Sequence, residues 1–264
     1  MKPTTFRYQE RDAVATVTLD RPETLNSLSF EIYQELEALF AHLKTRREVR
    51  AVVLTGAGRG FCSGGNVHDI IGKLLDRDSP ALLEFTRMTG AVVRNMRACP
   101  QPIVAAVNGI AAGAGSVLAL AADIRIAAEN AKFAFLFVKV GLAGADMGAA
   151  FLLPRVVGLG RATELLLLGD TVSAIDAERY GLVSRVLPDE QLLDEALALA
   201  QRLADGPGLG IAMTKQMLDR ELSMTLDDAI EAEAQAQALL MRSHDFREFY
   251  EAFVGKRPPR FEGR

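Results

Sequence analysis

Two short apolar runs, each ending in a glycine-rich loop, constrain the fold of this 264-residue chain more than any other feature. The run 51–55 leads into Gly56-Ala-Gly-Arg-Gly60, and the run 102–108 leads into a loop that ends at Gly115. Uninterrupted apolar runs of this length are typical of strands buried on both faces. Apolar residues at helical spacing predict a helix at 29–45, before both runs. A second helix is expected between about residues 80 and 99. This alternation predicts an α/β core.

The rest of the chain continues the alternation and then becomes helical. We expect further strands at 13–19, 124–127 and 133–138 and a helix at 116–122. From about residue 160 onward the pattern predicts helices at 162–168, 174–180, 190–204 and 226–254. The predicted organisation is therefore an α/β core over residues 1–195 and a C-terminal helical region over residues 196–264.

Composition excludes several classes of protein and ligand. The net charge is −4, and no basic stripe with interleaved aromatic residues occurs, so nucleic acid is not an expected partner. The two cysteines, Cys62 and Cys99, cannot form a disulfide framework, and the three scattered histidines have no metal-ligand spacing. We therefore expect a cytoplasmic location and no bound metal.

A signal peptide and a membrane span are not expected either. The N-terminal segment MKPTTFRYQERD has no apolar core, which a secretory signal requires. Residues 98–122 carry no charge over a length that could cross a bilayer, but two prolines and three glycines interrupt them. A buried strand, a loop and a helix explain this stretch better than a span.

The two glycine loops, 60–66 and 108–115, suit the binding of a developing negative charge. Glycine and alanine let a ligand approach the backbone, and free N–H groups at a helix N-terminus attract an anion. If the loops converge, they form an oxyanion hole. Phosphate binding is less favoured because Phe61 stands where a G-x-G-x-x-G fingerprint needs glycine, and no Walker-type Gly-Lys-Ser/Thr occurs. The remaining alternative is that these glycines only permit tight turns and close packing.

Five segments taken together, in order, resemble the enoyl-CoA hydratase/isomerase, or crotonase, superfamily over nearly the whole chain. They are Arg21-Pro-Glu-Thr-Leu-Asn-Ser27, Gly60-Phe-Cys-Ser-Gly-Gly65, Ala106-Val-Asn-Gly-Ile-Ala-Ala-Gly-Ala-Gly115, Ala122-Asp-Ile-Arg-Ile-Ala127 and Leu153-Pro-Arg-Val-Val-Gly158. The resemblance implies a crotonase-like spiral of ββα units. It also implies a C-terminal helical region that packs on neighbouring subunits in homotrimers or homohexamers.

The resemblance further implies an acyl-CoA substrate, with coenzyme A as part of that substrate and no separate cofactor. The backbone N–H groups of Gly65 and Ala114 would bind the thioester oxygen and stabilise an enolate. The positions that the resemblance places against the substrate or coenzyme A are Asn26, Ser63, Gly64, Asn66, Val67, Val117 and Phe137.

The chain departs from the family's hydratases at the two glutamates that they use as acid and base. Val117 and Phe137 occupy those positions, and neither can carry a proton. Asp146, eight residues before Pro154, matches instead the catalytic aspartate of the family's isomerases. The phenylacetyl-CoA-pathway isomerases, enzymes of aromatic degradation, resemble the chain most. A standard hydratase is therefore disfavoured.

Asp146 also has suitable chemistry and one structural alternative. Its apolar sequence neighbours should partly desolvate the carboxylate and raise its pKa, and a single carboxyl group suffices to move a proton between two carbons. The alternative is that Asp146 caps the helix that runs toward Pro154. Apolar residues that suggest an acyl pocket are Phe135, Phe137, Phe151 and Leu152.

Other polar residues are interpreted as structural. Cys62 with His68 lacks a third orienting group for a nucleophile, and Glu164 is expected on a solvated helix face. The basic tail could meet coenzyme A phosphates, although solubility explains it equally well. Three functions remain open: double-bond or ring isomerisation through Asp146; the reaction of a hydratase, a hydrolase or a ring-processing lyase; and acyl-CoA binding without catalysis.

Overall fold

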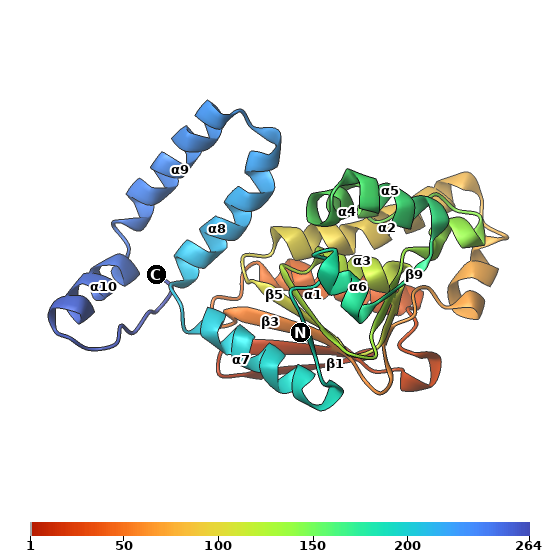
Figure 1. The fold of residues 1–264 in the computed structure, drawn as a ribbon, viewed down its shortest axis with the longest axis horizontal. Coiled ribbons are helices and arrows are strands. Elements are labelled where there is room, and N and C mark those ends of the chain that lie inside the picture. The colour runs from red at the N-terminus through yellow and green to blue at the C-terminus, as the bar shows by residue number, and fades with distance from the viewer. Residues whose placement is uncertain (1) are drawn as a thin grey trace.

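The computed structural model describes residues 2–264 and has two sheets at its core (Figure 1). The larger sheet contains, in spatial order, β1 (Phe6–Arg11), β2 (Val14–Leu19), β3 (Ala51–Gly56), β5 (Ile103–Val107), β7 (Ile124–Ala128) and β10 (Arg185–Leu187). The smaller contains β4 (Gly60–Cys62), β6 (Ile110–Ala112), β8 (Lys132–Ala134) and β9 (Thr171–Ser173). The β1–β2 and β8–β9 pairs are antiparallel, and the other pairs are parallel.

The chain passes from one sheet to the other and then into a helix, three times in succession. Strands β3, β5 and β7 of the larger sheet are followed directly by β4, β6 and β8 of the smaller one. The helices that follow are α2 (Ser79–Ala98), α3 (Ala114–Ala121), and α4 (Ala149–Val157) with α5 (Leu159–Leu168). This arrangement confirms the predicted spiral of ββα units.

The larger sheet is buried on both faces, which explains the uninterrupted apolar runs. Val52 and Leu54 of β3 belong to the main core cluster, which includes α1 (Phe30–Leu43), whereas Val53 faces α7 (Leu192–Ala204). One face of α7 carries apolar residues at four-residue spacing, a leucine and three alanines, that pack on this sheet: Leu192, Ala196, Ala200 and Ala204. The predicted boundary at residue 195 falls inside α7, and the division into a core and a C-terminal helical region stays a prediction.

Several predicted elements differ from the observed ones. The expected strand 133–138 ends at Ala134, and Leu136–Val140 form a 3₁₀ helix, because a short apolar run does not distinguish a strand from a buried helical turn. The expected helix 226–254 is two helices, α9 (Leu226–Leu240) and α10 (His244–Val254), since Ser243 caps α10 by accepting a hydrogen bond from the backbone N–H of Phe246.

The short strands β4, β6, β9 and β10 were not predicted, and neither were β1 and α8 (Gly208–Arg220). Strand β1 is an edge strand in which only Phe6 is buried, so it lacks an apolar pattern. Helix α8 begins with Gly-Leu-Gly and has Lys215 as its buried residue. Helix α6 (Ala174–Arg179), in contrast, matches the predicted range 174–180 closely.

Helices α8, α9 and α10 extend from the core as an arm (Figure 1). A partly buried ion network attaches its first helix. The ammonium of Lys215 lies 2.8 Å from Asp123 Oδ2 and donates to the carbonyl oxygens of Met96 (3.1 Å) and Gln101 (2.9 Å). Arg97 of α2 pairs with both Asp123 (2.9 Å) and Asp219 of α8 (2.5 Å). These contacts hold α8 beside the C-terminal half of α2.

The uncharged stretch 98–122 folds as β5, β6 and α3 with their connections. Within the described part of the chain, no helix combines the length and the apolar character needed to cross a bilayer.

Candidate active site

The two glycine loops meet at one edge of the smaller sheet. Strands β4 and β6 are parallel neighbours, so the loops that follow them leave the sheet on the same side. A Cβ atom added to Gly64 would lie 2.8 Å from the carbonyl oxygen of Ala112 and 3.6 Å from the backbone nitrogen of Ala114. One added to Gly115 would lie 2.0 Å from the carbonyl oxygen of Cys62. The backbone of one glycine loop therefore packs on the backbone of the other, and the predicted convergence of the two loops is confirmed.

Two backbone N–H groups at this junction, those of Gly65 and Ala114, are free. Gly113 donates to the carbonyl oxygen of Ala134 (2.8 Å), and Asn66 donates to that of Leu28 (2.9 Å). Between these engaged neighbours, neither Gly65 nor Ala114 donates to any acceptor in residues 2–264. Ala114 is the first residue of α3, whose N-terminus adds a partial positive charge. The arrangement can bind an oxygen that gains negative charge, and the oxyanion role stays a prediction.

Asp146 lies in the turn that precedes α4. Its carboxylate accepts a hydrogen bond from the backbone N–H of Met147 (2.8 Å) and forms no ion pair with any described residue. Burial raises its pKa, and the Met147 hydrogen bond only partly opposes this. Helix α4 begins after Gly148 without a side-chain cap, so the alternative that Asp146 caps this helix is wrong. The expected rise in pKa is borne out in direction.

Tyr33 is a neighbour of Asp146 that sequence reasoning missed. Its side chain, on α1, is 3% exposed, and its ring packs edge-on against Phe85 at 6.0 Å. Burial raises the pKa of the Tyr33 phenol well above its usual value, with further contributions from the acidic groups of Cys62 and Asp146. Asp146 is thus within electrostatic reach of Tyr33. The available signal was a tyrosine on the apolar face of the helix predicted at 29–45.

The two positions that would hold glutamates in a hydratase contain buried apolar side chains. Val117 is fully buried in α3. Phe137 is 7% exposed, and its Cε1 lies 4.0 Å from the position of a Cβ added to Gly113. Phe137 therefore packs over the loop that carries Ala114, and neither position supplies a proton-transfer group.

Two of the predicted binding residues hold the loops in place with their side chains. Asn26 is 1% exposed and donates to the carbonyl oxygens of Ala57 (2.9 Å) and Gly60 (2.6 Å). The Ser63 hydroxyl donates to the carbonyl oxygen of Thr24 (3.0 Å). Both amide hydrogens of Asn26 are therefore engaged within the protein, and its side chain supports the segment that ends in Gly65.

The next two predicted binding residues lie at the entrance of a short helical turn. The side-chain oxygen of Asn66 accepts from the backbone N–H groups of His68 and Asp69, both at 2.9 Å, and so caps this turn. Val67 is 62% exposed. Of the predicted set, Val67 is thus the side chain most open to a ligand, and contact with substrate or coenzyme A remains a prediction for all of them.

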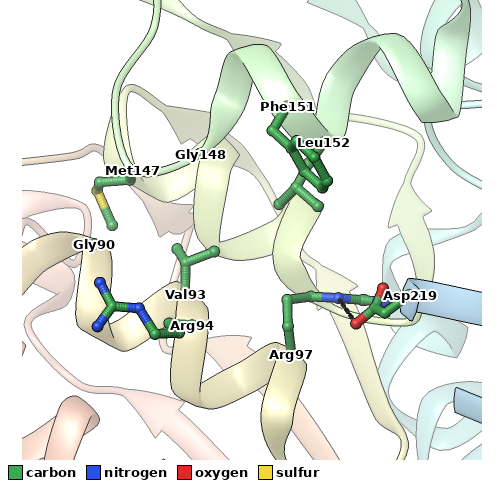
Figure 2. A pocket seen from close by; sticks show the side chains of 9 residues that line it. All are labelled: Gly90, Val93, Arg94, Arg97, Met147, Gly148, Phe151, Leu152 and Asp219. Carbon is green, nitrogen blue, oxygen red and sulfur yellow. Dashed lines mark hydrogen bonds and ion pairs between the residues drawn. The ribbon is translucent and has the colours of Figure 1, made fainter. Parts of the chain in front are cut away.

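A cavity of about 500 Å³ borders the Asp146 turn (Figure 2). Its wall on the α4 side is formed by Met147, Gly148, Phe151 and Leu152. The remaining lining residues are Gly90, Val93, Arg94 and Arg97 of α2 and Asp219 of α8. Phe151 and Leu152 were expected in an apolar pocket and do line this one. Phe135, by contrast, is buried in the core at 1% exposure.

The residues interpreted as structural behave as expected. Cys62 is fully buried, and burial raises the pKa of its thiol to about 12, which is unsuited to a nucleophile. Glu164 is exposed and pairs with Arg161 at 2.5 Å. In the basic tail, Arg257 pairs with Glu248 at 2.6 Å, so this cation is already neutralised.

Comparisons with known proteins agree with this geometry. The family model for enoyl-CoA hydratase/isomerase matches residues 9–264. The chain is 42% identical to the 1,2-epoxyphenylacetyl-CoA isomerase of Escherichia coli K12, with 95% of each protein covered, and 36% identical to the (E)-benzylidenesuccinyl-CoA hydratase of Thauera aromatica, covering 95% and 96%. A crystal structure from Streptomyces coelicolor A3(2), described as an enoyl-CoA hydratase, superposes with a TM-score of 0.97 at 57% identity, covering 99% and 95%. The chain is an enzyme that belongs to the enoyl-CoA hydratase/isomerase family.

Proposed function

We propose that this enzyme moves a double bond within an enoyl-CoA thioester. The N–H groups of Gly65 and Ala114 bind the thioester oxygen, which lowers the free energy of the enolate. Asp146 removes a proton from one carbon and returns it to another. The proton leaves and re-enters the same acyl group, so the step balances without water, a metal or a redox cofactor.

The observation that carries this proposal is the Asp146 carboxylate, which is partly buried and has no ion-pair partner within residues 2–264. Its pKa is raised by burial, which brings a carboxyl group closer to the range in which it both accepts and returns a proton. Val117 and Phe137 leave no second carboxylate at the positions where hydratases hold their acid and base. A single carboxyl group fits migration better than the addition of water.

Two relatives favour second candidates. The E. coli relative is named as an isomerase of an epoxide, so rearrangement of a ring attached to the thioester is one alternative. The Thauera relative is named as a hydratase, so hydration with a water oriented by Asp146 is another. Hydrolysis and a ring-processing lyase reaction stay open as further alternatives. All of these reactions develop negative charge on the thioester oxygen, which the N–H groups of Gly65 and Ala114 would bind. Hydration and hydrolysis incorporate oxygen from water, whereas double-bond migration and ring rearrangement do not.

The test is incubation with a 3-enoyl-CoA in heavy-oxygen water, followed by mass spectrometry, with Asp146→Asn in parallel. Migration predicts a 2-enoyl thioester without heavy oxygen and a loss of turnover in the variant. Heavy oxygen in the product would establish hydration or hydrolysis instead. Turnover of an epoxide but not of the 3-enoyl thioester would assign ring rearrangement.

We also propose a homotrimer or a pair of trimers. The arm exposes large apolar side chains that a partner would cover; they include Leu218, Leu226, Leu239, Phe249, Tyr250 and Phe253. Sedimentation equilibrium tests this assembly. A cytoplasmic location is proposed from the two cysteines, which are free and buried.

A further inference from the structure

The cavity in Figure 2 shares a turn of chain with Asp146. Met147, whose N–H binds the Asp146 carboxylate, and Gly148 form part of its wall. A Cβ atom added to Gly148 would lie 3.9 Å from Val93 Cγ1, so this turn packs directly on α2 at the residue that precedes Arg94. An acyl group whose reacting carbons lie at Asp146 therefore has this cavity beside it.

The walls of the cavity are mainly apolar, and its two arginines differ in their electrostatic state. Arg97 is neutralised, since it pairs with Asp123 and Asp219. Arg94 is exposed at the mouth of the cavity and forms no hydrogen bond and no ion pair with any residue in the described range 2–264. Glu37 and Glu84 border the neighbouring hollow that Arg94 also lines, and neither pairs with it. The cavity thus has one uncompensated cation.

The direction of this cation is visible in Figure 2. The Arg97 side chain extends toward Asp219, whereas the Arg94 guanidinium extends toward the Met147 side of the cavity. Gly90 lies one turn before Arg94 on α2 and places no side chain between Arg94 and Met147. A Cβ atom added to Gly90 would meet nothing within 4 Å. A guanidinium in this position can reach an anion at the end of an acyl group and bind a carboxylate through two parallel hydrogen bonds.

We propose that Arg94 is a specificity-determining residue that selects acyl groups with a carboxylate at their far end. This inference rests on the proposed function, because it names the substrate class of that same site. A hydrocarbon tail fills the apolar walls without using the guanidinium. A dicarboxylic acyl group fills the same walls and neutralises Arg94 as well.

The test measures binding and needs no turnover. Saturated thioesters with six, eight and ten acyl carbons are titrated calorimetrically as matched pairs, for example hexanoyl-CoA against adipoyl-CoA. The variants are Arg94→Ala and Arg94→Lys. Arg87→Ala is the matched control, because Arg87 lies on the same helix, also lacks an ion pair, and lines only the neighbouring hollow.

We expect the dicarboxylic thioester of at least one length to bind more tightly to the wild type than its monocarboxylic partner. Arg94→Ala should weaken that complex roughly 3- to 10-fold, because solvent at the exposed guanidinium screens the contact, and leave the monocarboxylic complex within about twofold. Arg94→Lys should restore part of the difference, since it keeps the charge but not the paired hydrogen bonds. Arg87→Ala should leave both complexes unchanged.

Three results would overturn the inference in distinguishable ways. If monocarboxylic thioesters bind well and Arg94→Ala changes the difference in affinity within no matched pair, the specificity role is wrong while the proposed function stands. If no thioester binds, the proposed function is wrong and the specificity role with it. If Arg94→Ala changes the sedimenting mass without altering the preference, Arg94 is an assembly contact.

Discussion

Asp146→Asn should lower activity strongly and leave stability unchanged or increased. General acid–base groups contribute about 100- to 10,000-fold to rate, which corresponds to roughly 3–5 kcal/mol of activation free energy. The amide keeps an oxygen that accepts the 2.8 Å hydrogen bond from Met147. It removes the charge whose partial burial raises the carboxyl pKa. Because Asp146 is partly open to solvent, we expect the unfolding free energy to rise by no more than about 1 kcal/mol.

The pH dependence of this stability difference has a definite sign. A carboxyl group whose pKa is raised on folding stabilises the folded state when it is protonated. That contribution is fully present below its ordinary pKa, near about 4, and is lost as the pH rises through the folded-state value. The variant has no such group. Its stability relative to the wild type should therefore increase from about pH 4 toward neutrality.

Urea unfolding across this pH range, together with kcat on a 3-enoyl-CoA, measures both effects. Asp170→Asn is the control, because Asp170 is exposed and pairs with Lys139 at the surface. It should leave kcat unchanged and alter the unfolding free energy by less than about 0.5 kcal/mol. A loss of more than about 1 kcal/mol in the Asp146 variant, or an unchanged kcat, would refute the reasoning.

The remaining predictions concern the helix, the loop and the ion network around the site, and urea unfolding measures each. Gly90→Ala should stabilise the protein by about 0.5–1 kcal/mol, because Gly90 is inside α2 and the added Cβ meets nothing within 4 Å; a loss would contradict the helical and spatial argument. Gly115→Ala should cost about 3 kcal/mol, because its Cβ would lie 2.0 Å from the carbonyl oxygen of Cys62; a neutral result would show that the two loops do not pack closely. Lys215→Met should cost about 3 kcal/mol by leaving Asp123 with a single cation, and adding Asp123→Asn should recover part of this; additive losses would argue against the pairing.

Local sequence patterns predicted several helices and strands of the fold correctly. The helix expected at 29–45 is observed at Phe30–Leu43, and the run 51–55 is strand β3, because apolar spacing reflects burial within one element. The same reasoning failed at Phe133–Val138, where a buried helical turn has an equally apolar sequence. It also failed for β1, an edge strand without an apolar face.

Sequence by itself determined which residue types are present for the proposed chemistry and in what order. Glycine loops after two buried strands, Val117 and Phe137 at the glutamate positions, and a lone Asp146 are properties of residue type and order. Only the tertiary structure decided that Gly65 and Ala114 both have free N–H groups at one junction. It also decided that α2, the Asp146 turn and α8 enclose a cavity with an unpaired Arg94. Periodicity reports which way a side chain faces, whereas convergence and pairing depend on contacts between residues far apart in the chain, and those exist only once the sheets have assembled.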